Sequence, residues 1–485
     1  MIAWDAARIA DAAGARLVHP GGELDRDAGS GAPPSPVDRP GPQRVVIDSR
    51  QVRPGDLFVG LPGERVDGGA YAADALRAGA WGVLVAPSPA ARAREGAASG
   101  AVLAHPDPLV ALQALARAWR RSLGAKVVAI TGSTGKTSTK DILAAVLSRE
   151  LRTAASPQNL NTEIGLPLAV LAAPARTEAL VLEMAMRGPG QIAELVAIAE
   201  PDVGVIVNVG PVHLELLGSV EAIAAAKAEL IAGLAPGATV VVPAAEPLLA
   251  PHLRSDLRTV TFGDSGDVEL AGRGDVGLAE GGVAGGGQTP GDVAIVEHRT
   301  AAPDVRMSVE PSFSQSHNLR NLLAAVAAAR ALGVTPGGTL DVTFSALRGE
   351  RIALADGIVL INDCYNANPM SMRAALDDLA ATAPARRVAV LGDMLELGDQ
   401  RGPELHRDVA AHASARGVEL LLAVGPQAAE MGETFAGEIH LAPDAAAAAE
   451  LLRPLLRPSD TVLVKGSRGV GLERVAETLL QGEAG

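Results

Sequence analysis

The chain has 485 residues, of which 48% are hydrophobic, 20% are charged and only 2% are aromatic. This composition excludes wholesale disorder, and at about 150 residues per domain the length predicts roughly three domains. The 56 acidic residues outnumber the 42 basic ones, for a formal net charge of −14. That balance argues against nucleic acid or an anionic membrane surface as a partner.

The single cysteine and the opening residues bear on where the protein works. One cysteine, Cys364, excludes an intrachain disulfide and a cysteine-rich metal site, which fits a reducing compartment. The segment Met1–Arg8 has an early acid and no basic start before an apolar run, so no signal peptide is predicted. No apolar stretch approaches the length of about 18 residues that a membrane span needs. We therefore expect a cytoplasmic protein without membrane insertion.

Three segments interrupt the regular pattern of the chain. Residues 21–43 are rich in Gly, Pro, Asp and Ser and are predicted to be a flexible loop. Residues 87–100 combine Ala, Pro and Gly with little periodicity. Residues 263–292 are Gly-rich, which predicts a long loop or insertion.

Elsewhere, short β-rich runs alternate with helical stretches, in the middle of the chain and again in its last third. Such alternation predicts parallel sheets covered on both faces. The predicted strands are Lys126–Ile130, Ala179–Glu183, Val203–Asn208, Ala238–Val242, Val388–Leu391, Leu420–Val424 and Thr461–Val464, and the predicted helices include Lys140–Leu151 and Gly190–Ala199. We predict an α/β protein of three domains, 1–122, 123–335 and 336–485.

The strongest motif is ITGSTGKTST, residues 130–139, between a predicted strand and a predicted helix. Its glycines let backbone N–H groups face phosphate oxygens, and the start of the helix adds favourable partial charge. Lys136 would reach the β- and γ-phosphates of ATP, and the Thr137 hydroxyl would bind Mg²⁺. Ile130 stands where the common form of this loop has its first glycine, so the loop is the compact G-x-x-G-K-T type. A Gly-rich turn that merely caps a helix is the alternative.

Two more stretches follow predicted strands, where a parallel sheet places its ligands. Glu183 ends one strand, and His213 follows another. A carboxylate and an imidazole beside a triphosphate could hold a divalent metal. Taken alone, however, Glu183 is more often a helix cap or an ion-pair partner, and His213 a loop histidine. Lys227 lies on a helical stretch, where a solvated lysine is the ordinary case.

Together these motifs resemble the Mur ligases, the ATP-dependent amide-forming enzymes of peptidoglycan precursor synthesis. The resemblance runs nearly end to end, through Ile47–Arg50, Pro54–Phe58, Gly132–Ser138, Asn159–Pro167, Glu183–Met184, Arg187–Gly190, Asn208–His213, His317–Asn321, Asp363–Pro369, Leu391–Gly398 and Lys465–Arg468. The phosphate loop marks only the superfamily. The stretches YNANP (365–369) and LGDMLELG (391–398) are similar to the members that add D-alanyl-D-alanine.

The resemblance implies roles for individual residues. In the ATP site it places Gly132, Ser133, Thr134, Gly135, Lys136, Thr137 and Ser138, with His317, Asn318 and Asn321 near the adenine. At Mg²⁺ it places Thr137, Glu183 and His213, with Lys227 as a carbamate, and the catalytic set is Lys136, Lys227, His213 and Glu183. For substrates it implies Ser49 and Arg50 at the uridine nucleotide, Asn161 and Thr162 at the muramyl part, Asp363, Tyr365, Asn366 and Asn368 at the reacting groups, and Asp393 and Glu396 at the dipeptide. Arg348 and Arg351 both lie near the second domain boundary, and the sequence does not choose which contacts ATP.

The resemblance also implies the reaction. The first domain would bind the UDP part of the substrate, a central phosphate-loop, parallel-sheet domain would be the ATPase-like core, and a Rossmann-like third domain would bring the dipeptide. ATP would convert the terminal carboxylate of UDP-N-acetylmuramoyl-tripeptide into an acyl phosphate, which the amine of D-alanyl-D-alanine attacks. We expect a monomer. The alternatives are a sister ligase that adds a single amino acid or glutamate to folate, and a non-catalytic nucleotide-binding switch. The third peptide residue, diaminopimelate or lysine, is left open.

Overall fold

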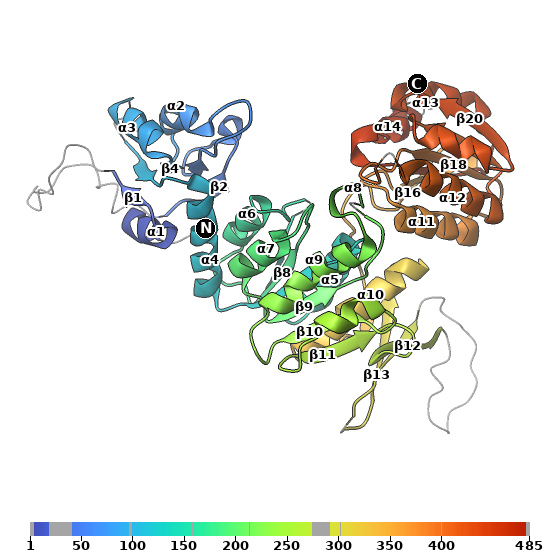
Figure 1. Ribbon diagram of the computed structural model, residues 1–485, viewed down its shortest axis with the longest axis horizontal. Helices are drawn as coiled ribbons and strands as arrows, with labels where there is room; N and C mark the ends of the chain where they lie inside the picture. Colours follow the sequence, from blue (N-terminus) through green and yellow to red (C-terminus); the bar gives the residue numbers. More distant parts are fainter. Residues whose placement is uncertain are drawn as a thin grey trace, which may run out of the picture.

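The computed structural model has three α/β domains in a row, coloured blue, green to yellow, and orange to red in Figure 1. This architecture confirms the predicted fold class. Among its described residues, no helix is both long and apolar enough to cross a membrane. The structure describes residues 4–18, 41–96, 99–157, 159–212, 214–273, 292–300, 302–398 and 400–481.

The N-terminal domain is a five-stranded sheet with helices on both faces. Its strands in spatial order are β1 (Arg16–Leu17), β5 (Ala101–Ala104), β4 (Gly82–Val85), β3 (Leu57–Val59) and β2 (Val45–Val46), all parallel except β1. Its helices are α1 (Ala6–Ala13), α2 (Ala72–Arg77), α3 (Pro87–Gly96) and α4 (Pro108–Leu123). Side chains alternate along each strand, so that Leu57 and Val59 pack toward α1 and α4, and Phe58 packs toward α2 and α3.

The middle domain is built on a ten-stranded sheet. In spatial order the strands are β15 (Gly338–Leu340), β14 (Val305–Pro311), β13 (Val293–Glu297), β12 (Val268–Arg273), β11 (Arg258–Phe262), β10 (Thr239–Pro243), β9 (Val203–Ile206), β6 (Lys126–Thr131), β8 (Ala179–Glu183) and β7 (Thr153–Ala155). Only the β12–β13 and β13–β14 pairs are antiparallel. The inner strands β8, β9 and β10 are almost wholly apolar because both of their faces are covered.

Two groups of helices cover this sheet. Val128 and Ile130 pack against α5 (Lys136–Leu147) and α10 (Ser316–Ala331). Val127 and Ala129 point to the opposite face, which is covered by α6 (Gly165–Ala172), α7 (Gln191–Ala199) and α9 (Val220–Gly233). Strand β6 lies inside the sheet, between β9 and β8, and the loop that follows it leads directly to the start of α5.

The C-terminal domain has a six-stranded sheet that is parallel except for its first strand. In spatial order the strands are β16 (Glu350–Ala353), β17 (Val359–Asn362), β21 (Thr461–Lys465), β18 (Arg387–Gly392), β19 (Leu420–Val424) and β20 (Glu438–Ala442). One face is covered by α11 (Pro369–Thr382) and α12 (Gly402–Ala415), and the other by α13 (Ala445–Leu452) and α14 (Glu473–Gln481). The loops after β17, β18 and β21 leave the same edge, where a doubly wound sheet binds ligands.

Helix α4 packs against the middle domain at the first junction, and α11 approaches the middle domain at the second. Trp119 of α4 donates from Nε1 to the Ala173 carbonyl (3.1 Å) beneath the middle domain. At the other junction, Met370 of α11 lies over Gly210, where an added Cβ would stand 1.9 Å from its Sδ. In this arrangement the edge of the C-terminal sheet faces the phosphate loop.

The structure corrects three expectations about organisation. Residues 87–96 form helix α3, because prolines are tolerated in a first turn and the remaining alanines favour helix. Residues 268–273 form strand β12, while 274–291, like 19–40, lie outside the described residues. Strand β15 still belongs to the middle sheet, so the chain passes to the C-terminal sheet between Leu340 and Glu350, later than the expected 335/336.

Candidate active site

The loop between β6 and α5 has the geometry of a phosphate cradle. Gly135 caps α5 with a left-handed backbone (φ 74°), and a Cβ there would stand 2.5 Å from Asn321 Oδ1, so only glycine fits. The N–H groups of Ser133 and Thr134 both donate to Asn208 Oδ1, at 3.1 and 2.9 Å. Asn208 follows β9, so the neighbouring strand holds the loop open toward the start of the helix.

Lys136 and Lys227 place two amines at this loop. Lys136 Nζ donates to the Gly132 carbonyl (2.9 Å). Burial lowers the pKa of Lys136, Arg348 lowers it further, and Glu183 and Glu396 oppose the shift. Lys227, on α9, is only 2% exposed, and burial together with the charge of Lys136 holds its pKa well below the usual value. The ordinary expectation for Lys227, a solvated helix lysine, is therefore wrong.

Glu183, the last residue of β8, is the acceptor for two neighbours. Thr137 Oγ1 donates to its Oε2 (2.7 Å), and Asn161 Nδ2 donates to its Oε1 (2.9 Å). Glu183 and Thr137 are each 2% exposed. A buried carboxylate held by a hydroxyl and an amide supplies the hard oxygen ligands that Mg²⁺ prefers. His213 lies outside the described residues.

The first turn of α10 supplies a second polar wall. Asn321 Nδ2 donates to Asn318 Oδ1 (3.3 Å), and both side chains are buried. Burial lowers the pKa of His317, against an opposing effect of Asp363 across the domain junction. The buried His317 Nδ1 has no hydrogen-bond partner among the described residues. A neutral imidazole edge and two amides can recognise a heterocyclic base.

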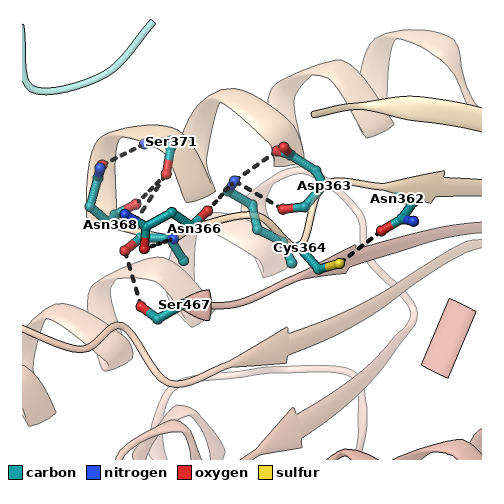
Figure 2. A network of polar contacts seen from close by, with 9 residues as sticks. Asn362, Asp363, Cys364, Asn366, Asn368, Ser371 and Ser467 are labelled. Carbon is teal, nitrogen blue, oxygen red and sulfur yellow. Dashed lines mark hydrogen bonds and ion pairs between the residues drawn. The ribbon is translucent and has the colours of Figure 1, made fainter. Parts of the chain in front are cut away.

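The C-terminal half of the site is the loop that follows β17 (Figure 2). Asn368 caps α11 by accepting from the Ser371 N–H (3.0 Å), and Ser371 Oγ accepts from the Asn368 N–H (3.0 Å). This capping box explains why the sequence turns here. The Arg348 guanidinium lies 4.1 Å from the centre of the Tyr365 ring, an arrangement typical of a cation–π contact.

One cavity of about 1360 Å³ brings these groups together. It exceeds the 300–1,000 Å³ of an ordinary small-molecule site, so it has room for more than one substrate. Both the middle and the C-terminal domain line it. The predicted residues in its wall are Ser133, Thr134, Gly135, Lys136, Thr137, Ser138, Asn161, Thr162, Glu183, His317, Asn318, Asn321, Asp363, Tyr365, Asn366, Asn368 and Glu396.

Five predicted residues among those described lie outside the cavity wall: Gly132, Lys227, Ser49, Arg50 and Asp393. Gly132 is part of the phosphate loop, and Lys227, on α9, is close enough to Lys136 for that charge to lower its pKa. Ser49 and Arg50 are on the N-terminal domain, in a short 3₁₀ turn (Ser49–Gln51) capped by Asp48. Arg50 is exposed and pairs with Asp48 (2.8 Å), which holds the pKa of that carboxyl at about 2. These two residues therefore lie on a different domain from the two that line the cavity.

Asp393 is a correction. It is 6% exposed, and its Oδ1 accepts from the Ala428 N–H (2.6 Å) inside the C-terminal domain. Its carboxylate therefore ties the loop after β18 to the segment after β19 and does not line the cavity. Glu396, three residues on, does line the cavity, with a left-handed backbone (φ 70°). The sequence of an acidic pair in a loop does not show which of the two side chains faces the cavity.

Two arginines and one lysine were left without an assignment by the sequence. Arg351 is engaged by Asp378 and Thr382, both at 2.7 Å from its Nη2. Arg348 instead faces Tyr365 and is close enough to Lys136 to affect that amine's pKa. Lys465, at the end of β21, also lines the cavity. Its position in the Lys465–Arg468 motif was the only available signal.

Models of three protein domains match this chain: the Mur ligase family catalytic domain at residues 43–120, the Mur ligase middle domain at 130–329, and the Mur ligase glutamate ligase domain at 347–468. The UDP-N-acetylmuramoyl-tripeptide–D-alanyl-D-alanine ligase of Bacillus subtilis is 34% identical over 453 residues, covering 90% of this chain and 93% of the relative. The MurF ligase of Thermotoga maritima, solved with ADP, is 30% identical with a TM-score of 0.73, covering 90% of this chain and 97% of that one. MurF of Acinetobacter baumannii is 27% identical with a TM-score of 0.79, covering 99% of both chains.

Proposed function

This chain belongs to the Mur ligase family, and from that premise we propose how its cavity works. It is a ligase that adds D-alanyl-D-alanine to UDP-N-acetylmuramoyl-tripeptide in peptidoglycan synthesis. We propose that the middle domain activates the carboxylate and that the C-terminal domain brings the dipeptide. One observation supports this: the phosphate loop and the loops of the C-terminal domain line the same cavity. An activated carboxylate and its attacking amine can therefore meet there.

ATP is proposed to bind across the phosphate loop, with its base against α10. The loop N–H groups and the start of α5 suit phosphate oxygens, and His317, Asn318 and Asn321 suit the adenine edge. Arg348, and not Arg351, is the arginine proposed to contact the phosphates. Support comes from the Asp378 and Thr382 contacts that hold Arg351 and from the proximity of Arg348 to Lys136.

Mg²⁺ is proposed to bind at Thr137 and Glu183, together with His213. The described residues hold no cluster of three or more His, Cys, Asp or Glu fit for a metal, so the site depends on the threonine hydroxyl and on phosphate oxygens. When bound, the ion would neutralise charge on the transferring phosphoryl group. Lys227 is proposed to react with CO₂ as a neutral amine, giving an anionic carbamate beside this site. Its lowered pKa and low exposure support that chemistry.

The reaction begins from a carboxylate, which is a poor electrophile. One oxygen of the terminal carboxylate of the tripeptide attacks the γ-phosphorus of ATP, ADP leaves, and an acyl phosphate results. The neutral amine of D-alanyl-D-alanine then attacks the carbonyl carbon, and inorganic phosphate leaves with that carboxylate oxygen. Lys136 stabilises charge on the transferring group. Apposition of the C-terminal domain excludes water that would hydrolyse the acyl phosphate.

The substrates are proposed to span all three domains, divided as 1–122, 123–335 and 336–485 apart from the later crossover already described. Ser49 and Arg50 face the uridine nucleotide, where an arginine fork suits a diphosphate. Asn161 and Thr162 face the muramyl part. Asp363, Tyr365, Asn366, Asn368 and Glu396 face the dipeptide and the reacting groups. We propose that the enzyme acts as a monomer in the cytoplasm.

The test is ADP release from ATP and UDP-N-acetylmuramoyl-tripeptide, with and without D-alanyl-D-alanine. The proposal expects that the dipeptide stimulates release strongly and that free D-alanine, L-lysine or D-glutamate does so poorly. A preference for any single amino acid would indicate a sister ligase. ATP binding without turnover under every condition would indicate a nucleotide-binding switch.

A further inference from the structure

Lys465 is a buried lysine whose hydrogen bonds, within the described part of the chain, all go to one loop. It ends β21 and is 2% exposed. Its Nζ donates to Asp363 Oδ2 (2.7 Å), to the Asn366 carbonyl (3.0 Å) and to the Asp363 carbonyl (3.4 Å). Figure 2 shows Asp363 and Asn366 in this loop. A lysine in so dry a place is costly unless its donors are satisfied. Here three acceptors from the loop after β17 satisfy them.

Ser467, two residues on, connects that loop to a second one. Its Oγ accepts from the Leu395 N–H (2.9 Å) and donates to the Ala367 carbonyl (3.4 Å). Its own N–H donates to the Asp393 carbonyl (3.0 Å). Residues 465–467 therefore lie between the loop 363–368 and the loop 393–396, with bonds to both. These two loops carry every C-terminal residue that we assign to the dipeptide.

We propose that Lys465 and Ser467 are positioning residues for the dipeptide: they fix the two substrate-facing loops at the spacing that D-alanyl-D-alanine needs. Lys465 fixes the loop 363–366 and the direction of the Asp363 carboxylate, and Ser467 fixes the loop 393–396 against Ala367. This inference rests on the proposed function. It predicts that loss of Lys465 damages the second step, amine attack, while the phosphoryl transfer at the middle domain continues.

The expected size of the effect follows from geometry. Removal of the amine leaves two carbonyls and a carboxylate without their donor, so the loop 363–366 must shift to find water. A misplacement of about 1 Å in a reacting group costs on the order of 10²-fold in rate. We expect a loss of this size in kcat/KM for D-alanyl-D-alanine.

The experiment separates the two steps in the full-length enzyme. Hydroxylamine traps the acyl phosphate as a hydroxamate when ATP and UDP-N-acetylmuramoyl-tripeptide are present without dipeptide. Lys465→Met should form hydroxamate within about twofold of the parent and lose kcat/KM for the dipeptide about 10²-fold. Lys465→Arg should recover part of the loss because the positive charge stays. If the parent itself forms no hydroxamate, the proposed function fails, and not this inference.

Arg386→Met is the matched control, because Arg386 pairs with Asp460 (3.2 Å), just before β21 and so at the opposite end of the strand that Lys465 ends. It should lower thermal stability while kcat/KM for the dipeptide stays within about twofold of the parent. Equal losses of hydroxamate and ligation in Lys465→Met, or a loss of kcat/KM matched by Arg386→Met, would overturn the inference. Should Lys465→Met not fold, Ser467→Ala decides: a kcat/KM for the dipeptide lowered about tenfold with hydroxamate formation kept supports the positioning role, and an unchanged kcat/KM refutes it.

Discussion

The middle domain presents its reactive groups from regular elements, whereas the C-terminal domain presents them from loops. Lys136 and Thr137 lie on the first turn of α5, and Glu183 is the last residue of β8. Opposite them, Asp363 and Glu396 sit in loops beyond β17 and β18. Thr137 and Glu183 are buried, Lys136 is half-buried, and the Glu183 charge acts on Lys136. In the second set, the buried Lys465 holds the Asp363 carboxylate (2.7 Å), and the Glu396 carbonyl accepts from the Glu215 N–H of the middle domain (3.3 Å).

Lys136→Ala should produce the largest loss of activity, because it removes from the middle domain a charge that stabilises the transition state. We expect activity to fall about 10³-fold or more. The melting temperature should stay near that of the parent, since Lys136 contributes no apolar packing. Steady-state ADP release and a thermal melt measure the two outcomes. Substantial turnover in a folded variant would contradict the assignment.

Substitutions of Lys227 test whether catalysis in the middle domain depends on a carbamate at this lysine. Lys227→Ala should lose most activity, and short carboxylic acids should restore part of it by supplying the missing anion. Lys227→Arg should fail because a guanidinium does not form a carbamate. Burial and the charge of Lys136 hold the pKa of Lys227 well below its usual value, so the neutral amine is more available than in an ordinary lysine, and activity should decline as acid protonates it. Full activity in Lys227→Arg would show that the carbamate is not needed.

Substitution of Arg348 tests how the middle and C-terminal domains act together. Its guanidinium lies over the Tyr365 ring, and its charge lowers the pKa of Lys136. Arg348→Ala should lower kcat/KM for ATP about 10²-fold, the usual cost of one charged transition-state donor. Arg351→Ala serves as the matched comparison. Its contacts to Asp378 and Thr382 are local, so its kinetic change should stay within about threefold. The reverse ranking of the two variants would reassign the phosphate contact.

The smallest expected effect is on the alkylation rate of Cys364, which reports on how readily the loop after β17 opens. Its thiol is buried and donates to Asn362 Oδ1 (2.9 Å), and burial raises its pKa to about 12. At pH 9 the folded protein then carries about one thiolate per thousand molecules, against about three quarters in the unfolded chain, where the thiol pKa is about 8.5. Alkylation at this pH should be about 10²–10³-fold slower in the native protein. This stabilisation of the thiol is lost as pH rises through about 12. Rapid native labelling would show that the loop after β17 opens readily.

The difference between the middle and the C-terminal domain also explains how much of the site the sequence could predict. The phosphate loop follows from strand, glycine, lysine, threonine and helix in one short run, so Lys136 and Thr137 could be assigned from residue chemistry alone. Strands such as Ala179–Glu183 and Leu420–Val424 were predicted residue for residue because both faces are apolar. Helix α3 was missed because its Pro and Gly content obscured the buried Ala90 and Ala93.

The C-terminal half could be predicted only through the family resemblance. Asn and Asp clusters form turns wherever they occur, so no local rule distinguishes Asn368, which caps a helix and faces the cavity, from an ordinary turn residue. Asp393 turned inward to the Ala428 N–H because the neighbouring loop after β19 offers a buried donor. The role of Lys465 depends on contacts about 100 residues away in sequence, which periodicity cannot reveal.

The most direct test of the whole account follows the fate of one oxygen atom. UDP-N-acetylmuramoyl-tripeptide labelled with ¹⁸O in both oxygens of its terminal carboxylate is incubated with ATP, D-alanyl-D-alanine and the enzyme, and the released phosphate is analysed by mass spectrometry. The account predicts one ¹⁸O in the phosphate for each pentapeptide formed, because phosphate leaves with the carboxylate oxygen. Pentapeptide formation accompanied by unlabelled phosphate would contradict it.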